Sequence, residues 1–366
     1  MTTPKTRKTK KRLEQYAQTK PDQLTLFEML DRDGEYSNSI ELYDFIPKYF
    51  WGKVQRERAV KAQKEILPNL KRDFECRGTQ YRVEIKPASI EGSDGISRDY
   101  FPSKREELVE DALRKLACEG AGIFLDDQAG LTFTLYQLHQ ELKARGHGYK
   151  IADLKEALYV LAETHLELTT ADGKAVMKAN MFQALGLKTR EDWKGAGKKT
   201  MGFVRFNPLV TASIKNLTFR QLDYEKAMSF VSVIARQLYK RMSHNYIQAS
   251  RISPPYSIML STIIRDFGLT PYAELRNNLR DVIRALDEMK EKKVIQDYHV
   301  EKTHDPQRRN KLVDAKLLIT TTEKFIWEMR KANQKAKERE KVQISGDPDS
   351  RVKKLQAQAE ALTNKR

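Results

Sequence analysis

Apolar side chains recur every three or four residues in the second half of the chain, which is the spacing of an amphipathic helix. One such stripe predicts a helix over 225–244 and consists of Met228, Val231, Ile234, Ala235 and Leu238. Another predicts a helix from Pro271 to Lys290 and consists of Leu275, Leu279, Val282, Leu286 and Met289. Thr270 is expected to cap this second helix, with Pro271 at its first position, where a missing N–H costs nothing. A shorter helix is predicted over 257–267.

Strands are predicted after these helices, over 294–300 and 312–320. The segment between them, 303–311, contains Asp305-Pro306, a pair that favours a turn. Helices followed by a hairpin with a basic tip are the pattern of a winged helix.

The same order of elements is predicted in the first half. Ser103 and Glu106 have the spacing of a capping box and begin a helix. Further helices are expected over 135–145 and 151–163, followed by two or three strands within 165–208 around a basic loop. An opening hairpin is predicted over residues 80–100, with its turn at Gly92 to Gly95.

The sequence therefore predicts an α+β fold, mainly helical, with two tandem winged-helix domains. The first is assigned to residues 41–222, with the opening hairpin, and the second to 223–322. Residues 1–40 form a basic leader that is expected to be disordered, and 323–366 form a charged tail, helical or disordered.

The net charge of the chain indicates which class of partner it binds. It has 67 Lys and Arg against 50 Asp and Glu in 366 residues, a formal net charge of +17. Such an excess suits nucleic acid, because basic groups that neutralise phosphates release condensed counterions. The sequence has no long apolar run, so a membrane is not predicted as a partner. Cys76 and Cys118 have no ligand-like spacing, so a reducing cytoplasm is the expected location.

Double-stranded DNA is the partner that the helix Pro271 to Lys290 predicts. Arg276, Arg280 and Arg284 follow a four-residue spacing away from the apolar stripe, with Asn277 beside them. In the major groove Arg pairs with guanine and Asn with adenine. The alternative is a solvated face in which the arginines pair with Asp281, Asp287 and Glu288.

The two predicted hairpin tips supply further candidates for contact with phosphate. The second tip contributes Arg308, Arg309 and Lys311, and the first contributes Lys194, Lys198 and Lys199. An ordinary exposed hairpin tip is the alternative for each of them. The first domain has few basic residues on its helix 151–163, so it is expected to serve in pairing or in weak backbone contact.

The sequence contains no enzyme signature, and no catalytic set, cofactor or metal is predicted. The segment Gly197 to Thr200 superficially resembles a phosphate-binding loop. However, Asp192 stands where the first glycine is needed, and Lys199 replaces the required Ser or Thr. The six histidines have no metal-ligand spacing.

A short peptide near the start, Gln23-Leu24-Thr25-Leu26-Phe27, resembles the motif by which bacterial replication proteins dock on the sliding clamp. In that motif the glutamine and the terminal Leu-Phe pair enter adjacent pockets, so Gln23, Leu24, Leu26 and Phe27 are the predicted clamp-binding residues. The alternative is an amphipathic turn that packs on its own domain.

The chain from about Glu41 to Thr322 resembles the replication initiator protein A family of proteobacterial plasmids, a winged-helix, iteron-binding type. The segments that carry the resemblance are Leu42–Tyr49, Leu67–Gly78, Arg98–Pro102, Arg105–Ala117, Phe133–Tyr136 and Glu156–Leu158.

This resemblance implies a non-catalytic function. Such initiators bind repeated origin sequences (iterons), open an adjacent A·T-rich segment and recruit host proteins, among them the replicative helicase and the clamp. It also implies a homodimer that represses its own gene. The other function that stays open is a winged-helix transcription regulator without initiator activity. A nicking replication enzyme is disfavoured.

Overall fold

The computed structural model describes residues 36–51, 57–59, 67–91, 95–125, 128–187, 201–216, 218–246, 254–308 and 311–344. Several predicted functional residues lie outside these ranges, namely Gln23, Leu24, Leu26, Phe27, Lys194, Lys198, Lys199 and Arg309.

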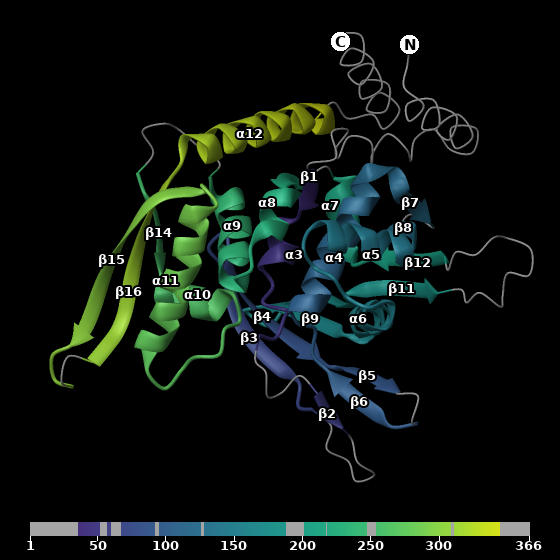
Figure 1. The fold of residues 1–366 in the computed structure, drawn as a ribbon, viewed down its shortest axis with the longest axis horizontal. Helices are drawn as coiled ribbons and strands as arrows, with labels where there is room; N and C mark the ends of the chain where they lie inside the picture. Colours follow the sequence, from purple (N-terminus) through teal and green to yellow (C-terminus); the bar gives the residue numbers. More distant parts are fainter. Residues whose placement is uncertain are drawn as a thin grey trace, which may run out of the picture.

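Helices pack on a three-stranded antiparallel sheet in the second half of the described chain (Figure 1). The elements in chain order are α9 (Val233–Asn245), β14 (Tyr256–Met259), α10 (Leu260–Asp266), α11 (Leu275–Glu291), β15 (Ile295–Asp305) and β16 (Lys311–Thr321). The strand order is β14-β16-β15, so the strand before α10 pairs with the last strand of the hairpin. This is the arrangement of a winged helix.

The helix predicted over 225–244 is two helices, α8 (Tyr224–Ser229) and α9. At the break, the Glu288 carboxylate of α11 accepts hydrogen bonds from the backbone N–H groups of Val231 and Ser232, at 2.6 and 2.9 Å. The Ser232 hydroxyl then caps α9 by accepting from the Ala235 N–H. The single-helix prediction was wrong because a side chain from a distant element satisfies the interrupted backbone.

The helix predicted over 257–267 begins three residues late. Residues Tyr256–Met259 form β14 and pair with β16, and α10 starts at Leu260. Ile258 is buried in this strand. A four-residue strand followed at once by a helix leaves no clear period in the sequence, so the prediction missed it.

The first half repeats this order of elements. The matching set is α4 (Lys104–Leu116), β8 (Gln128–Thr134), α5 (Leu135–Ala144), α6 (Ile151–Glu163), β11 (Phe182–Leu187) and β12 (Met201–Phe206). Its strand order is β11-β12-β8, extended by β7 (Gly122–Leu125). The predicted capping box begins α4, where Glu106 accepts from the Ser103 N–H at 2.8 Å.

An additional hairpin separates α6 from β11 in this half. It consists of β9 (His165–Thr170) and β10 (Ala175–Asn180), and it joins β4 (Thr79–Lys86) and β3 (Leu70–Cys76) in a sheet of order β10-β9-β4-β3. Strand β5 (Ala88–Glu91) pairs antiparallel with β6 (Ser97–Tyr100), and β2 (Glu57–Ala59) also pairs with β6. Most of the predicted turn, residues 92–94, lies outside the described residues. The predicted opening hairpin is therefore β5–β6, and β4 belongs to another sheet.

The remaining elements of the described chain are short, except for the 22-residue helix α12 (Glu323–Ile344). They are β1 (Tyr36–Ser39), α3 (Glu41–Phe45), the π-helix η1 (Ala117–Ala121), α7 (Pro208–Lys215), β13 (Arg220–Asp223) and α12. Strands take up nearly as much of the fold as helices, so the α+β class is found but "mainly helical" is not confirmed. The predicted boundary at 222–223 stays a prediction; the strand that contains it, β13, pairs with β1.

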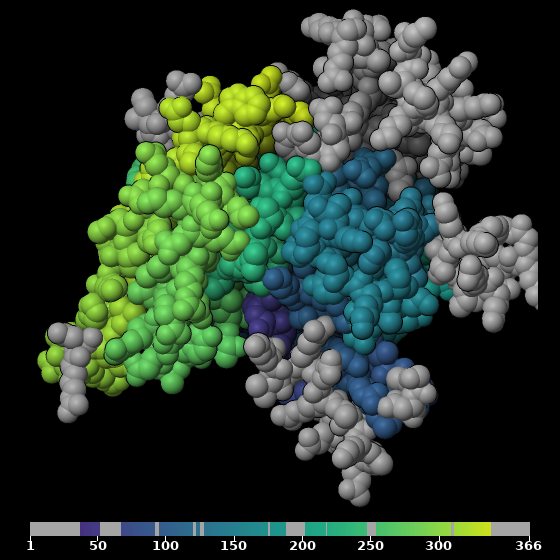
Figure 2. All heavy atoms as spheres, in the orientation of Figure 1, coloured from purple at the N-terminus to yellow at the C-terminus, as the bar shows by residue number. Residues whose placement is uncertain are grey.

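Two large hydrophobic cores lie in the described part, one for each half, together with a small third cluster of Ala88, Tyr100 and Val160. The first extends from Ile40 to Met228 and the second from Leu222 to Met329. Figure 2 shows the blue first half and the green second half in contact along their boundary.

A buried ionic cluster joins α4 of the first half to α9 of the second. Glu107 is fully buried and accepts hydrogen bonds from Arg236 at 2.7 Å, Gln237 at 2.6 Å and Lys240 at 3.3 Å. Lys240 also contacts Asp111 at 2.7 Å. Burial alone raises the pKa of Glu107, but Arg236 and Lys240 outweigh it and hold the pKa below its ordinary value. The cluster therefore fixes how α4 of the first half packs against α9 of the second half.

A second buried group lies at the same junction. His244 of α9 packs against Ser39, with 2.7 Å between its Nε2 and the Ser39 hydroxyl oxygen. The same hydroxyl donates to Asp44 at 2.7 Å, so the ring nitrogen is the donor to Ser39. Asp44 in turn pairs with Arg114 at 2.6 Å. Burial, together with nearby arginines, lowers the pKa of His244 to about 3.

Acid is expected to destabilise the protein through His244. The unfolded chain binds a proton on this ring near pH 6.5, whereas the folded chain does so only near pH 3. Between these values the unfolded state holds more protons, so the free energy of unfolding falls as pH falls, by up to about 1.4 kcal/mol per pH unit. Urea unfolding of the wild type and of His244→Gln from pH 7 to 4 checks this, and equal pH slopes for the two would contradict it.

Gly130 of β8 allows a close approach of two strands. A Cβ at this position would lie 2.3 Å from the backbone oxygen of Val204 in β12. Gly130→Ala is therefore expected to lower the free energy of unfolding by about 1–3 kcal/mol, because backbone must shift. The matched control is Gly186→Ala in β11, whose Cβ would meet Phe203 at an ordinary 3.9 Å. Equal urea midpoints for the two variants would show that the strands accommodate the methyl group.

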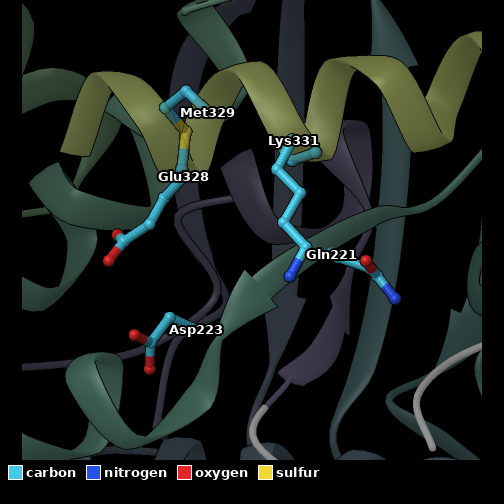
Figure 3. Close-up of a pocket in the computed structure, with 6 residues that line it drawn as sticks. Gln221, Asp223, Glu328, Met329 and Lys331 are labelled. Atoms are coloured by element: carbon cyan, nitrogen blue, oxygen red, sulfur yellow. The ribbon is translucent and has the colours of Figure 1, made fainter. Parts of the chain in front are cut away.

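Helix α12 lies along the upper edge of the structure in Figure 1 and packs against β13. Figure 3 shows Glu328, Met329 and Lys331 of α12 above Gln221 and Asp223 of β13, where they line a small pocket. The Arg220 guanidinium donates to the Met329 backbone oxygen at 3.4 Å. Within the described ranges, no helix is both long and apolar enough to traverse a bilayer.

Candidate nucleic-acid interface

Helix α11 has one face in the core and a cationic face in solvent. Leu279, Val282, Leu286 and Met289 are buried, as the periodicity predicts. On the other side, Arg276, Arg280 and Arg284 have exposed side-chain fractions of 72%, 58% and 71%. Since they recur every four residues of a 17-residue helix, they lie along one line of its surface.

The start of α11 differs from the prediction. The helix begins at Leu275, and the Asn278 side chain holds the segment before it. Its Oδ1 accepts from the Tyr272 N–H at 2.9 Å, and its Nδ2 donates to the Thr270 oxygen at 3.1 Å. Thr270 therefore does not cap the helix; a buried asparagine fixes the loop in front of it. The predicted DNA contact Asn277, by contrast, is half-exposed.

The ion pairs on this face are exposed and long. Arg280 and Arg284 lie 3.9 and 3.6 Å from the Asp281 carboxylate, and Arg276 lies 3.4 Å from Glu274. Pairs of this kind contribute little to stability, so their arginines can exchange a carboxylate for a phosphate or a base edge.

Two other acids that might have neutralised this face have different partners. Asp287 accepts a hydrogen bond from the Tyr298 hydroxyl at 2.7 Å. Glu288 holds the break between α8 and α9. Of the three acids expected to pair with the arginines, the structure therefore places Asp281 among them.

The hairpin of β15 and β16 extends far from the helices. Each strand has 11 residues, which corresponds to a reach of about 35 Å. The predicted turn is present at its tip, where the Asp305 carboxylate accepts from the Gln307 N–H at 2.9 Å. Arg308 is 76% exposed in this turn, and Lys311 is exposed at the start of β16. Two predicted cations thus lie at the end of a long wing.

The corresponding helix of the first half, α6, differs in its chemistry. Its sequence contains no arginine, and Ile151 and Tyr159 are exposed on it. Another side packs on the β5–β6 hairpin through Val160 and Ala88. The expectation that this half serves in pairing or in weak backbone contact stays a prediction. Strands β11 and β12 flank the predicted basic loop of this half.

Comparison with known proteins gives structural neighbours and no sequence relatives. No family model matches the chain, and no curated protein matches it. Among solved structures, the chain is similar to domains 2 and 3 of RctB, at 14% identity and a TM-score of 0.44, over 77% of this chain and 98% of that chain. A second structure of these RctB domains has 11% identity and a TM-score of 0.43, over 79% and 99%.

A further neighbour is the Pi initiator protein, whose structure contains iteron DNA. The identity is 14% and the TM-score 0.40, over 60% of this chain and 90% of that chain. An initiator protein is thus among the structural neighbours of this chain. The likeness is distant, and the assignment of the interface rests on the geometry of α11 and the wing.

Tyr272 is a candidate that the sequence prediction missed. Its ring is 50% exposed in the loop before α11, and the Asp281 carboxylate raises the pKa of its hydroxyl. Because the loop is held by Asn278, this aromatic side chain stands next to the cationic face. The sequence signal was present, an aromatic residue directly after Pro271, but it was read as the first turn of the helix.

Proposed function

We propose that the chain is a plasmid replication initiator that binds repeated origin DNA. The observation that carries the proposal is the cationic line of α11 (Arg276, Arg280, Arg284), which faces solvent at the recognition position of a winged helix. The basic wing beside it suits phosphate contact. The resemblance of residues 41–322 to the replication initiator protein A family supports the same function.

In this proposal, α11 enters the major groove and the tip of the wing follows the phosphate backbone. Several copies bound to adjacent repeats strain a neighbouring A·T-rich segment, where unstacking costs least. The proposal assigns no catalytic step to the chain, and it includes recruitment of the host helicase and a homodimeric form.

Footprinting tests this function. The purified protein is applied, at near-physiological salt with competitor DNA, to the DNA that flanks its own gene. Regularly spaced protected segments beside an A·T-rich stretch are expected. A single palindromic site over the promoter would instead favour a transcription regulator, and uniform weak protection would contradict sequence-specific binding.

The proposal also includes docking on the sliding clamp through Gln23, Leu24, Leu26 and Phe27, which lie outside the described residues. Replacing Leu26 and Phe27 by alanine is expected to abolish clamp binding and plasmid replication while DNA binding stays intact, because the two apolar anchors are lost. Thr25→Ala is the control, since Thr25 is no anchor in the motif. Clamp binding that survives the double substitution would refute the docking peptide.

A further inference from the structure

One carboxylate within helix α11 lies beside two cations of its exposed face. Asp281 is 3.6 Å from the Arg284 guanidinium and 3.9 Å from that of Arg280. It also interacts with the Tyr272 hydroxyl, whose pKa it raises. Its side chain is 29% exposed, so it reaches the surface that the arginines present.

Asp281 differs from Asp287 and Glu288 of the same helix in what it contacts. Glu288 fastens α11 to the break before α9, and Asp287 contacts the hairpin through Tyr298. These two carboxylates connect α11 to other elements of the fold. The partners described for Asp281 are Arg280, Arg284 and Tyr272, which lie on the proposed DNA-binding face itself. Asp281 therefore acts within this face, whereas Asp287 and Glu288 attach the helix to the rest of the fold.

A negative charge on Asp281 has different effects on contacts with DNA phosphates and on contacts with base edges. It repels phosphate, whose contact supplies most of the non-specific affinity. It also attracts the guanidinium groups of Arg280 and Arg284 and so favours side-chain positions on this face, which reduces the conformational freedom that is lost when they meet base edges. Specificity is a difference between two affinities, and a repulsive element that weakens the wrong complex increases it.

We propose that Asp281 is a specificity-determining residue of the α11 face, which disfavours non-specific phosphate contact and orients Arg280 and Arg284 toward base edges. The inference rests on the proposed function, because it concerns the same surface. It assigns to one acid a role that the arginines alone do not have.

Asp281→Asn tests the inference, since asparagine keeps the size and an acceptor for Tyr272 and removes the charge. Equilibrium dissociation constants are measured for the footprinted site and for random duplex of equal length, over a range of salt. Affinity for random DNA is expected to rise about three- to tenfold, with a salt slope steeper by about one. The preference for the specific site is expected to fall by a similar factor.

Asp172→Asn is the matched control. Asp172 lies in the turn between β9 and β10, pairs with Lys174 at 2.9 Å and is 55% exposed. The variant changes the net charge equally but lies far along the chain from α11. It is expected to keep the wild-type preference, and equal urea midpoints of the two variants confirm that both are folded.

The outcomes separate the inference from the proposed function. A wild type that prefers its site, with the same preference in Asp281→Asn, would overturn the inference alone. Loss of specific affinity without a gain on random DNA would also overturn it, because Asp281 would then contact a base or merely position the helix. A wild type without any preference would overturn the proposed function as well.

Discussion

Glu107→Ala is expected to lower the free energy of unfolding by about 3–5 kcal/mol, because it leaves Arg236 buried without a counter-charge and leaves Lys240 with Asp111 alone. Both cations are almost fully enclosed at the junction of the two halves. The variant should unfold at a clearly lower urea concentration. Since the cluster joins α4 to α9, separation of the halves is expected before either core unfolds, which gives two transitions by fluorescence.

The surface pair of Asp73 and Arg82 supplies the control. These side chains are 2.7 Å apart, as in the buried cluster, but are 54% and 60% exposed. Asp73→Ala should leave the urea midpoint almost unchanged, because water screens an exposed pair. A Glu107→Ala variant no less stable than Asp73→Ala would show that the junction does not depend on its ions.

The double substitution of Arg280 and Arg284 by alanine is expected to weaken binding to the specific site by about 2–5 kcal/mol. Each bidentate contact with a base discriminates by about 1–3 kcal/mol, and neighbouring contacts do not add fully. Binding to random DNA should weaken much less. The measurement is fluorescence anisotropy with both duplexes at the same salt concentration.

Arg82→Ala is the matched control, because it removes an exposed arginine from β4 in the first half. It should change binding to both duplexes little. If the double variant lost specific and random affinity equally, its arginines would contact phosphate and would carry no sequence information.

The sequence predicted those features that depend on local spacing. The buried stripe of α11, the outward line of arginines and the capping box at Ser103 all follow from residues three or four apart. The turn at Asp305 likewise depends on adjacent residues. Each of these features depends on residues close together in the sequence, so the sequence pattern is enough to predict it.

Contacts between distant residues account for what the sequence did not predict. The break before α9 depends on Glu288, more than fifty residues away. The start of α11 depends on the buried amide of Asn278. The β9–β10 hairpin gains its partners from β3 and β4, and such long-range pairing leaves no local pattern. Glu107 belongs to a charged run on α4, and nothing in its spacing indicates that it is buried at a junction.

Guanine methylation interference is the most direct test of the central claim, that α11 reads base edges in repeated sites. Methylation at N7 blocks the major-groove edge that an arginine pairs with. For the wild type, interference is expected at one or more guanines of each protected repeat, and for Arg280→Ala it is expected to be lost at a particular guanine. Absence of guanine interference in the wild type, or an unchanged pattern in the variant, would contradict base reading by this helix.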